Sequence, residues 1–133
     1  MRRALLLMAV ALVCASTSLA QDPVKVDAKH YKVVSENGQV RILRIHYGPR
    51  EKSVMHEHPN SVAVFLTDAH IKFTLPDGKA QDETGKAGDS RFAPAGKHNP
   101  ENLSDTAFDA ILVELKGKAA PPPPAKAAPK KKG

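Results

Sequence analysis

The chain contains one cysteine, no tryptophan and few aromatic residues of any kind. Because Cys14 lies in an N-terminal segment that is expected to be removed, the remaining protein has no disulfide, no thiolate nucleophile and no cysteine ligand for a metal. The sequence also shows no serine, histidine and aspartate order typical of a hydrolase and no glycine-rich loop that would cradle a phosphate. These absences argue against covalent and nucleotide-dependent mechanisms.

The first 20 residues have the charged, apolar and small-residue regions of a secretory signal peptide. Arg2 and Arg3 precede an apolar run at 4–13, and small residues continue to Ala20, after which we expect cleavage. Ten helical residues reach about 15 Å, half of a hydrocarbon core, so a transmembrane anchor is disfavoured. The paired arginines leave twin-arginine export open, and Cys14 leaves lipid attachment open. The prediction is a periplasmic or secreted protein.

The composition changes sharply after Leu115. Residues 116–133 hold six lysines, five prolines and no acidic residue, and they lack side chains that could form a core. We expect a disordered tail, either a solubilising extension or a weak electrostatic contact with an anionic envelope surface. Without those lysines, Arg2 and Arg3, 12 basic residues face 14 acidic ones, so the formal charge is −2 instead of +6. A nucleic-acid partner is therefore not expected.

Residues 21–115 are expected to form one all-β domain. Turn-forming pairs such as Asn37-Gly38 and Asp77-Gly78 divide the segment closely and predict hairpins. No window shows a long amphipathic helix, which favours a sandwich or a closed barrel. Residues rich in Val, Ile, Leu, Phe and Tyr predict strands at 29–35, 39–47, 61–67, 70–75, 90–92 and 107–115.

Three histidines are candidates for a metal site. His56 and His58 are separated by one residue, so in extended chain both imidazoles project to the same side while Glu57 points away. His98 comes forty residues after His58 in the sequence, where a neighbouring strand can bring it opposite the pair. Three neutral nitrogens suit a divalent metal and leave coordination positions open.

The sequence around these histidines resembles the two motifs of the cupin superfamily. The resemblance rests on the order and spacing of Gly48, His56-Glu57-His58, Gly88, Pro94, Gly96, His98 and Asn102. It implies a double-stranded β-helix of the jelly-roll type, with His56, His58 and His98 as ligands inside the barrel. The sequence departs from the motif where a glutamate ligand should follow, because Val62 and Ala63 stand at that place.

Several other polar residues are considered around this site. Glu101 and Asp105 follow His98 and are candidates for a supporting shell or a substitute ligand, although each also suits a solvated loop. Asn102 is a further candidate for that shell and also suits a turn. His46 and His70 are expected to face water. The remaining candidates, for a pocket mouth that holds an anionic group or for a solvated surface, are Arg44, Arg50 and Arg91.

The sequence therefore predicts an exported cupin that binds a divalent metal, which is iron, manganese, zinc, nickel or copper, and a small organic ligand. A metal-dependent oxygenase or isomerase fits this centre, and the alternative is a non-catalytic, metal-free module that binds a sugar or another metabolite. The strand at 107–115 has apolar residues on both faces, which favours a homodimer.

Overall fold

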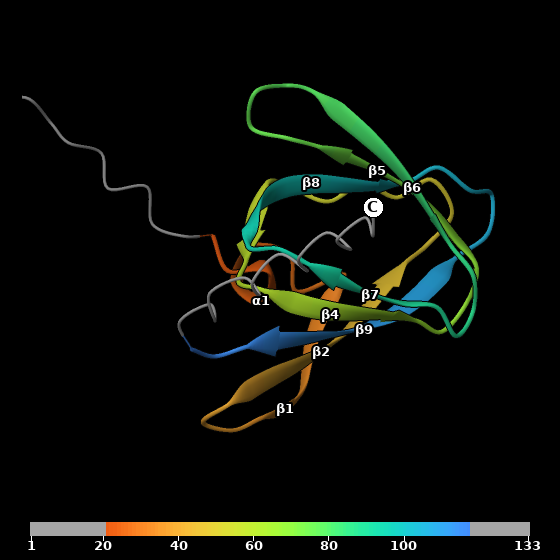
Figure 1. Cartoon of the computed structure of the whole chain (residues 1–133). Helices are drawn as coiled ribbons and strands as arrows, with labels where there is room; N and C mark the ends of the chain where they lie inside the picture. The colour runs from red at the N-terminus through yellow and green to blue at the C-terminus, as the bar shows by residue number, and fades with distance from the viewer. Residues whose placement is uncertain (1–20, 118–133) are drawn as a thin grey trace, which may run out of the picture.

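The computed structural model describes residues 21–117, which form two antiparallel sheets that face each other (Figure 1). One sheet has the strand order β1-β2-β9-β4-β7 and the other has β3-β8-β5-β6. The predicted all-β fold with jelly-roll sheets is confirmed. The elements are α1 (Pro23–Val26), β1 (Tyr31–Glu36), β2 (Val40–Tyr47), β3 (His56–His58), β4 (Ser61–Phe65), β5 (Ala69–Thr74), β6 (Ala80–Gly85), β7 (Ser90–Ala93), β8 (Gly96–Asn102) and β9 (Phe108–Leu115).

Both predicted hairpins are present. Asn37 begins the turn between β1 and β2, where its carboxamide oxygen accepts hydrogen bonds from the amides of Gln39 and Val40. Asp77 and Gly78 form the turn between β5 and β6, with Gly78 at a φ of 84°, a backbone conformation that favours glycine. Local turn chemistry thus sets two of the strand connections.

Three strands of the second sheet, β3, β6 and β8, lie outside the predicted strand set. β6 has the sequence AQDETG and β8 has GKHNPEN, and neither carries an alternating apolar pattern. β6 forms because its backbone pairs with β5, and β8 forms because it lies between β3 and β5. Pairing to neighbouring strands therefore overrides weak local β propensity here.

The core lies between the sheets, and β9 shows how it is filled. Phe108, Ala110 and Leu112 are buried, and they alternate with partly exposed residues that face outward. Leu43, which lies opposite Leu112 in the neighbouring strand, is fully buried. The inner face of this sheet is therefore mainly apolar around Leu43 and Leu112.

The ordered contacts at the carboxyl end reach one residue past the expected domain boundary at 115. The amide of Lys116 donates to the carbonyl of Gln39, and its ammonium group bonds to Glu36. The predicted signal peptide at 1–20 lies outside the described residues, as do residues 118–133 of the tail predicted at 116–133. Among residues 21–117, no helix has the length and apolar character needed to cross a membrane.

Candidate metal centre

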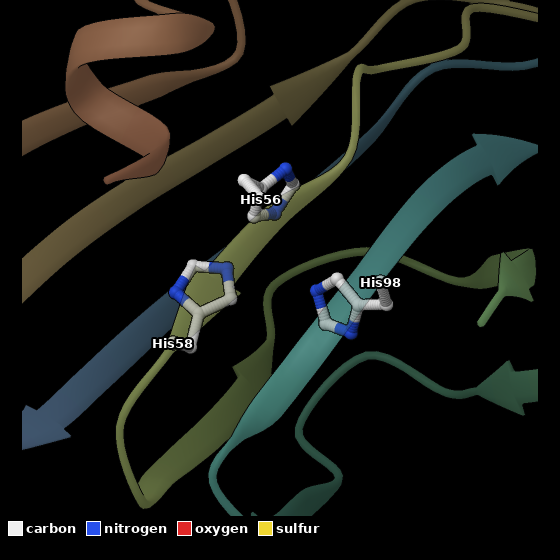
Figure 2. Close-up of side chains that lie close together, drawn as sticks. All are labelled: His56, His58 and His98. Atoms are coloured by element: carbon white, nitrogen blue, oxygen red, sulfur yellow. The ribbon is translucent and has the colours of Figure 1, made fainter. Parts of the chain in front are cut away.

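Two neighbouring strands bring the three histidines together. His56 and His58 stand at the two ends of β3, and β8 runs antiparallel beside it with His98 directly opposite His56. Glu57 pairs with Lys97 in the same ladder, on the other face. Figure 2 shows the three imidazoles converging on one point from these strands. The prediction that a neighbouring strand places His98 opposite the pair is confirmed.

The three rings are close enough to share one ion. Their centroids lie 4.8 Å (His56 to His58), 5.0 Å (His56 to His98) and 5.3 Å (His58 to His98) apart. One nitrogen from each ring can be chosen so that all three lie within 4.8 Å of one another. His56 is fully buried and His58 is 6% exposed, so the cluster belongs to the barrel interior.

The hydrogen bonds of two rings leave a nitrogen free for a metal. Nδ1 of His56 donates to the carbonyl of Val54 at 2.8 Å, and its buried Nε2 has no partner. Nδ1 of His58 lies 2.7 Å from Oε1 of Glu114 and donates to it, which leaves the Nε2 lone pair available. An orphaned buried nitrogen is costly without a partner. A divalent cation would satisfy it, so these residues fit a metal.

The electrostatics of the site keep the rings of His56 and His98 neutral, as metal ligation requires. Burial, followed by repulsion from His58, lowers the pKa of His56 to about 4. Burial, followed by repulsion from His58 and His56, lowers the pKa of His98 to about 3. At neutral pH both imidazoles therefore have an unprotonated nitrogen, and neither has to release a proton before it can bind a metal ion.

Several known protein structures have the same architecture as this chain. A cupin domain from Bordetella pertussis Tohama I is 27% identical, with a TM-score of 0.61 over 65% of this chain and 92% of that one. The chain is a cupin. A Klebsiella pneumoniae protein with a double-stranded β-helix domain shares the fold at 22% identity and a TM-score of 0.53, covering 68% of this chain and 78% of that one.

A more distant structure supports the same fold. An RmlC-like cupin family protein from Methanocaldococcus jannaschii is 15% identical, with a TM-score of 0.52 over 64% of this chain and 77% of that one. No protein-family model matches the chain, and no curated protein matches its sequence. The fold is thus visible in three dimensions where overall sequence similarity is weak.

One residue of β4 occupies the place of the glutamate that is missing from the cupin motif. β4 alternates so that Ser61, Ala63 and Phe65 line the interior cavity, whereas Val62 is not part of its lining. Ala63 is therefore the residue that stands where an inward carboxylate would reach the site. The substitution leaves three nitrogen donors and no carboxylate from this strand.

The candidates that follow His98 make other contacts in the described structure. Glu101 lies on the opposite face of β8 from His98 and forms an ion pair with Lys72 at 2.7 Å. Asn102 is buried on the same face of β8 as His98, but its side-chain NH₂ group donates hydrogen bonds to the carbonyls of Gly48 and Thr106. Asp105 lies beyond the strand, 84% exposed, and pairs with Arg50. None of these hydrogen bonds and ion pairs involves a histidine of the cluster.

The other histidines and arginines that the sequence singled out are mostly at the surface. His46 and Arg44 both bond Asp109 and are about half exposed, and His70 is 43% exposed beside Asp82. Arg91 is the exception, because it lines the cavity and lies over the ring of Phe65 with 5.2 Å from its guanidinium carbon to the ring centroid. Its proposed place at a pocket mouth therefore agrees with the structure.

Sequence reasoning missed an aromatic wall behind the cluster. The ring of Tyr31 packs against His56 and His58, with centroids 4.8 and 5.5 Å away. Its hydroxyl lies 2.8 Å from that of Tyr47, and burial raises the pKa of both phenols. Tyr47 is in turn stacked between His30 and Phe108. This wall packs against two rings of the histidine cluster.

A buried polar network continues from that wall to the surface. Ser53 lies 3.4 Å from Nδ1 of His56 and bonds Asp27. Asp27 contacts Nδ1 of His30 at 2.7 Å, and Nε2 of the same ring lies 3.0 Å from Glu51. These side chains come from two distant segments, 27–30 and 51–56, so no single local motif in the sequence predicts the network.

An apolar cavity of about 370 Å³ opens beside the histidines. His58 and His98 form one end of its lining, and Phe73 lies 4.8 Å from the ring of His98. The rest of the wall is mainly apolar and includes Ala63, Phe65, Ile71, Phe108, Ala110 and Leu112. Arg91 and Glu83, about 40% exposed and 3.4 Å apart, stand on its solvent side. The cavity can hold a small molecule within reach of a bound ion.

Proposed function

We propose that this cupin binds a divalent metal through His56, His58 and His98 and a small organic molecule in the adjoining cavity. The observation that carries the proposal is the buried Nε2 of His56, which has no hydrogen-bond partner and belongs to a cluster of three convergent rings. Iron, manganese, zinc, nickel and copper all accept such nitrogen donors.

The lining of the cavity supports a mainly apolar ligand. Aromatic and aliphatic side chains dominate the wall, and the charges of Arg91 and Glu83 at the solvent side balance each other. A neutral molecule with one oxygen directed at the histidines, such as a simple phenol or ketone, matches this distribution. Three protein ligands leave open positions, and a metal held in this way supplies Lewis acidity or oxygen activation, the chemistry of isomerases and oxygenases.

The test of the metal site is titration calorimetry of the metal-free protein with zinc, copper, nickel, manganese and anaerobic iron(II). The expected result is one ion per chain for at least one of these metals. Binding of phenol or a small ketone is then measured by NMR with and without that metal, and the metal-loaded form should bind more tightly. No uptake of any of the five ions would leave the metal-free binding module as the function.

We also propose that the protein is exported and that it forms a homodimer. The amino-terminal pattern at 1–20 supports export, and mature protein should begin at Gln21, which an intact-mass measurement checks. A lateral row of Ile42, Val113, Val62 and Phe92 across four strands supports dimerisation, because Phe92 is 59% exposed. A monomeric mass in light scattering at micromolar concentration would contradict the dimer.

A further inference from the structure

A buried carboxylate interrupts the apolar inner face of β9. Glu114 follows Phe108, Ala110 and Leu112 on that face and is only 2% exposed. Carboxylates are rarely buried unless they are paired. The partners of Glu114 therefore show why a charged residue occupies this position.

Both oxygens of Glu114 are engaged. Oε1 accepts from Nδ1 of His58 at 2.7 Å, across the space between the two sheets. Oε2 accepts from Nε of Arg41 at 2.6 Å, and Arg41 lies directly opposite Glu114 in the β2–β9 ladder. Burial alone would raise the pKa of Glu114, but the hydrogen bonds from His58 and Arg41 hold it below its ordinary value. Both oxygens act as hydrogen-bond acceptors, so neither carries a proton and Glu114 is a carboxylate.

The charges extend one residue further. A second nitrogen of Arg41 donates to Asp22 at 2.8 Å, so ion pairs join Asp22, Arg41 and Glu114, and a hydrogen bond joins Glu114 to His58. The charges of Asp22, Arg41 and Glu114 sum to −1 beside the ring of His58, which would face the metal. This equals the charge that Ala63 removes from the site relative to the glutamate of the cupin motif.

We propose that Glu114 is the positioning residue of the metal centre. It fixes His58 as the Nδ1–H tautomer, directs Nε2 at the ion, and supplies from β9 the negative charge that β4 lacks. Because both of its oxygens are already bonded, it acts through His58 and does not itself bind the metal. This inference rests on the proposed metal-binding function.

The test compares Glu114→Gln and Glu114→Ala with Glu57→Gln, using zinc titration of the purified protein. Glu57→Gln is the matched control, because it removes the same charge from the metal-binding strand but from a side chain that faces Lys97. The expected losses of zinc affinity are about tenfold for Glu114→Gln and 10- to 100-fold for Glu114→Ala, with no more than about twofold for Glu57→Gln. Equal losses at Glu114 and Glu57 would overturn the proposal.

A second measurement needs neither a variant nor a metal. Nitrogen-15 NMR of the imidazoles in the metal-free wild-type protein should show His58 protonated at Nδ1 and unprotonated at Nε2. The opposite tautomer would overturn the proposal even if both variants at Glu114 fail to fold. Wild-type protein that shows the expected tautomer but binds no zinc or other divalent ion would instead refute the metal-binding function and leave the hydrogen bond intact.

Discussion

His56 and His98 are direct partners in the β3–β8 ladder, with ring centroids 5.0 Å apart, although they come from distant parts of the sequence. Their pairing makes the cluster a property of two adjacent strands. Rigid strands hold ligands more accurately than loops do, and binding then costs little reorganisation. The proposed metal site is therefore preformed.

Removing any one of the three rings should disable the site. His56→Ala, His58→Ala and His98→Ala should each lower metal affinity at least tenfold, because a site with only three protein ligands binds weakly once one of them is lost. His70→Ala is the control, since His70 is 43% exposed and lies outside the cluster. The measurement is calorimetric titration, with thermal unfolding of each variant to confirm that it folds. Near-wild-type affinity in any of the three cluster variants would rule out a three-ligand centre.

Restoring a carboxylate on β4 should act at one position and not at its neighbour. Ala63→Glu is expected to strengthen metal binding by about tenfold, because Ala63 lines the cavity beside His58 and His98. Val62→Glu should leave affinity unchanged, because Val62 is outside the cavity lining. The metal-free Ala63→Glu protein should also be less stable, since it buries an unpaired charge. Stronger binding by Val62→Glu would mean that the face assignment of β4 is wrong.

The stability of the metal-free protein should fall as the pH is lowered from about 6.5 towards 4. The pKa values of His56 and His98 are about 4 and about 3 in the folded protein, against about 6.5 in the unfolded chain. The unfolded chain therefore binds more protons in this window, which lowers the free energy of unfolding. Thermal unfolding at intervals from pH 7 to 4.5 measures the decline, and His98→Gln should flatten it. A profile without slope would mean that these rings are protonated in the folded state.

Gly85 should not tolerate a side chain. A β-carbon at this position would stand 2.7 Å from the ring of Phe65, which lines the cavity. Gly85→Ala is therefore expected to lower the free energy of unfolding by about 1–3 kcal/mol through overpacking. Gly38→Ala is the control, because a β-carbon there meets no atom within 4 Å. Chemical denaturation of both variants provides the comparison, and equal stability would show that the Phe65 ring moves aside freely.

Much of the architecture could be predicted from local sequence. The Asn37-Gly38 and Asp77-Gly78 turns and the apolar strands around them are short-range features, and both were found where expected. The strands β6 and β8 could not be predicted in the same way, because their sequences are polar and their order comes from neighbouring strands. Of the site, the spacing of His56 and His58 predicted a shared face, and the cupin-like motif supported His98 as the third member.

A cue for Glu114 was present but incomplete. Alternation in 107–115 places Phe108, Ala110 and Leu112 on one face, and Glu114 continues that face as a charged residue among apolar ones. Such a residue must find a partner if it is buried. The sequence does not say which partner, because His58 belongs to the opposite sheet and Arg41 to a distant strand. The supporting shell expected at Glu101, Asn102 and Asp105 was sought near His98 in sequence instead of across the barrel.

By itself the sequence determined the strand-and-turn pattern, the two alternating histidines and the absence of a carboxylate after them, because each depends on residues within a few positions of one another. Only the tertiary structure decided which nitrogen of His58 faces the site, which charge compensates at Ala63 and how large the cavity is. Those properties arise where the two sheets meet, and contacts between sheets join residues whose separation along the chain carries no periodic pattern.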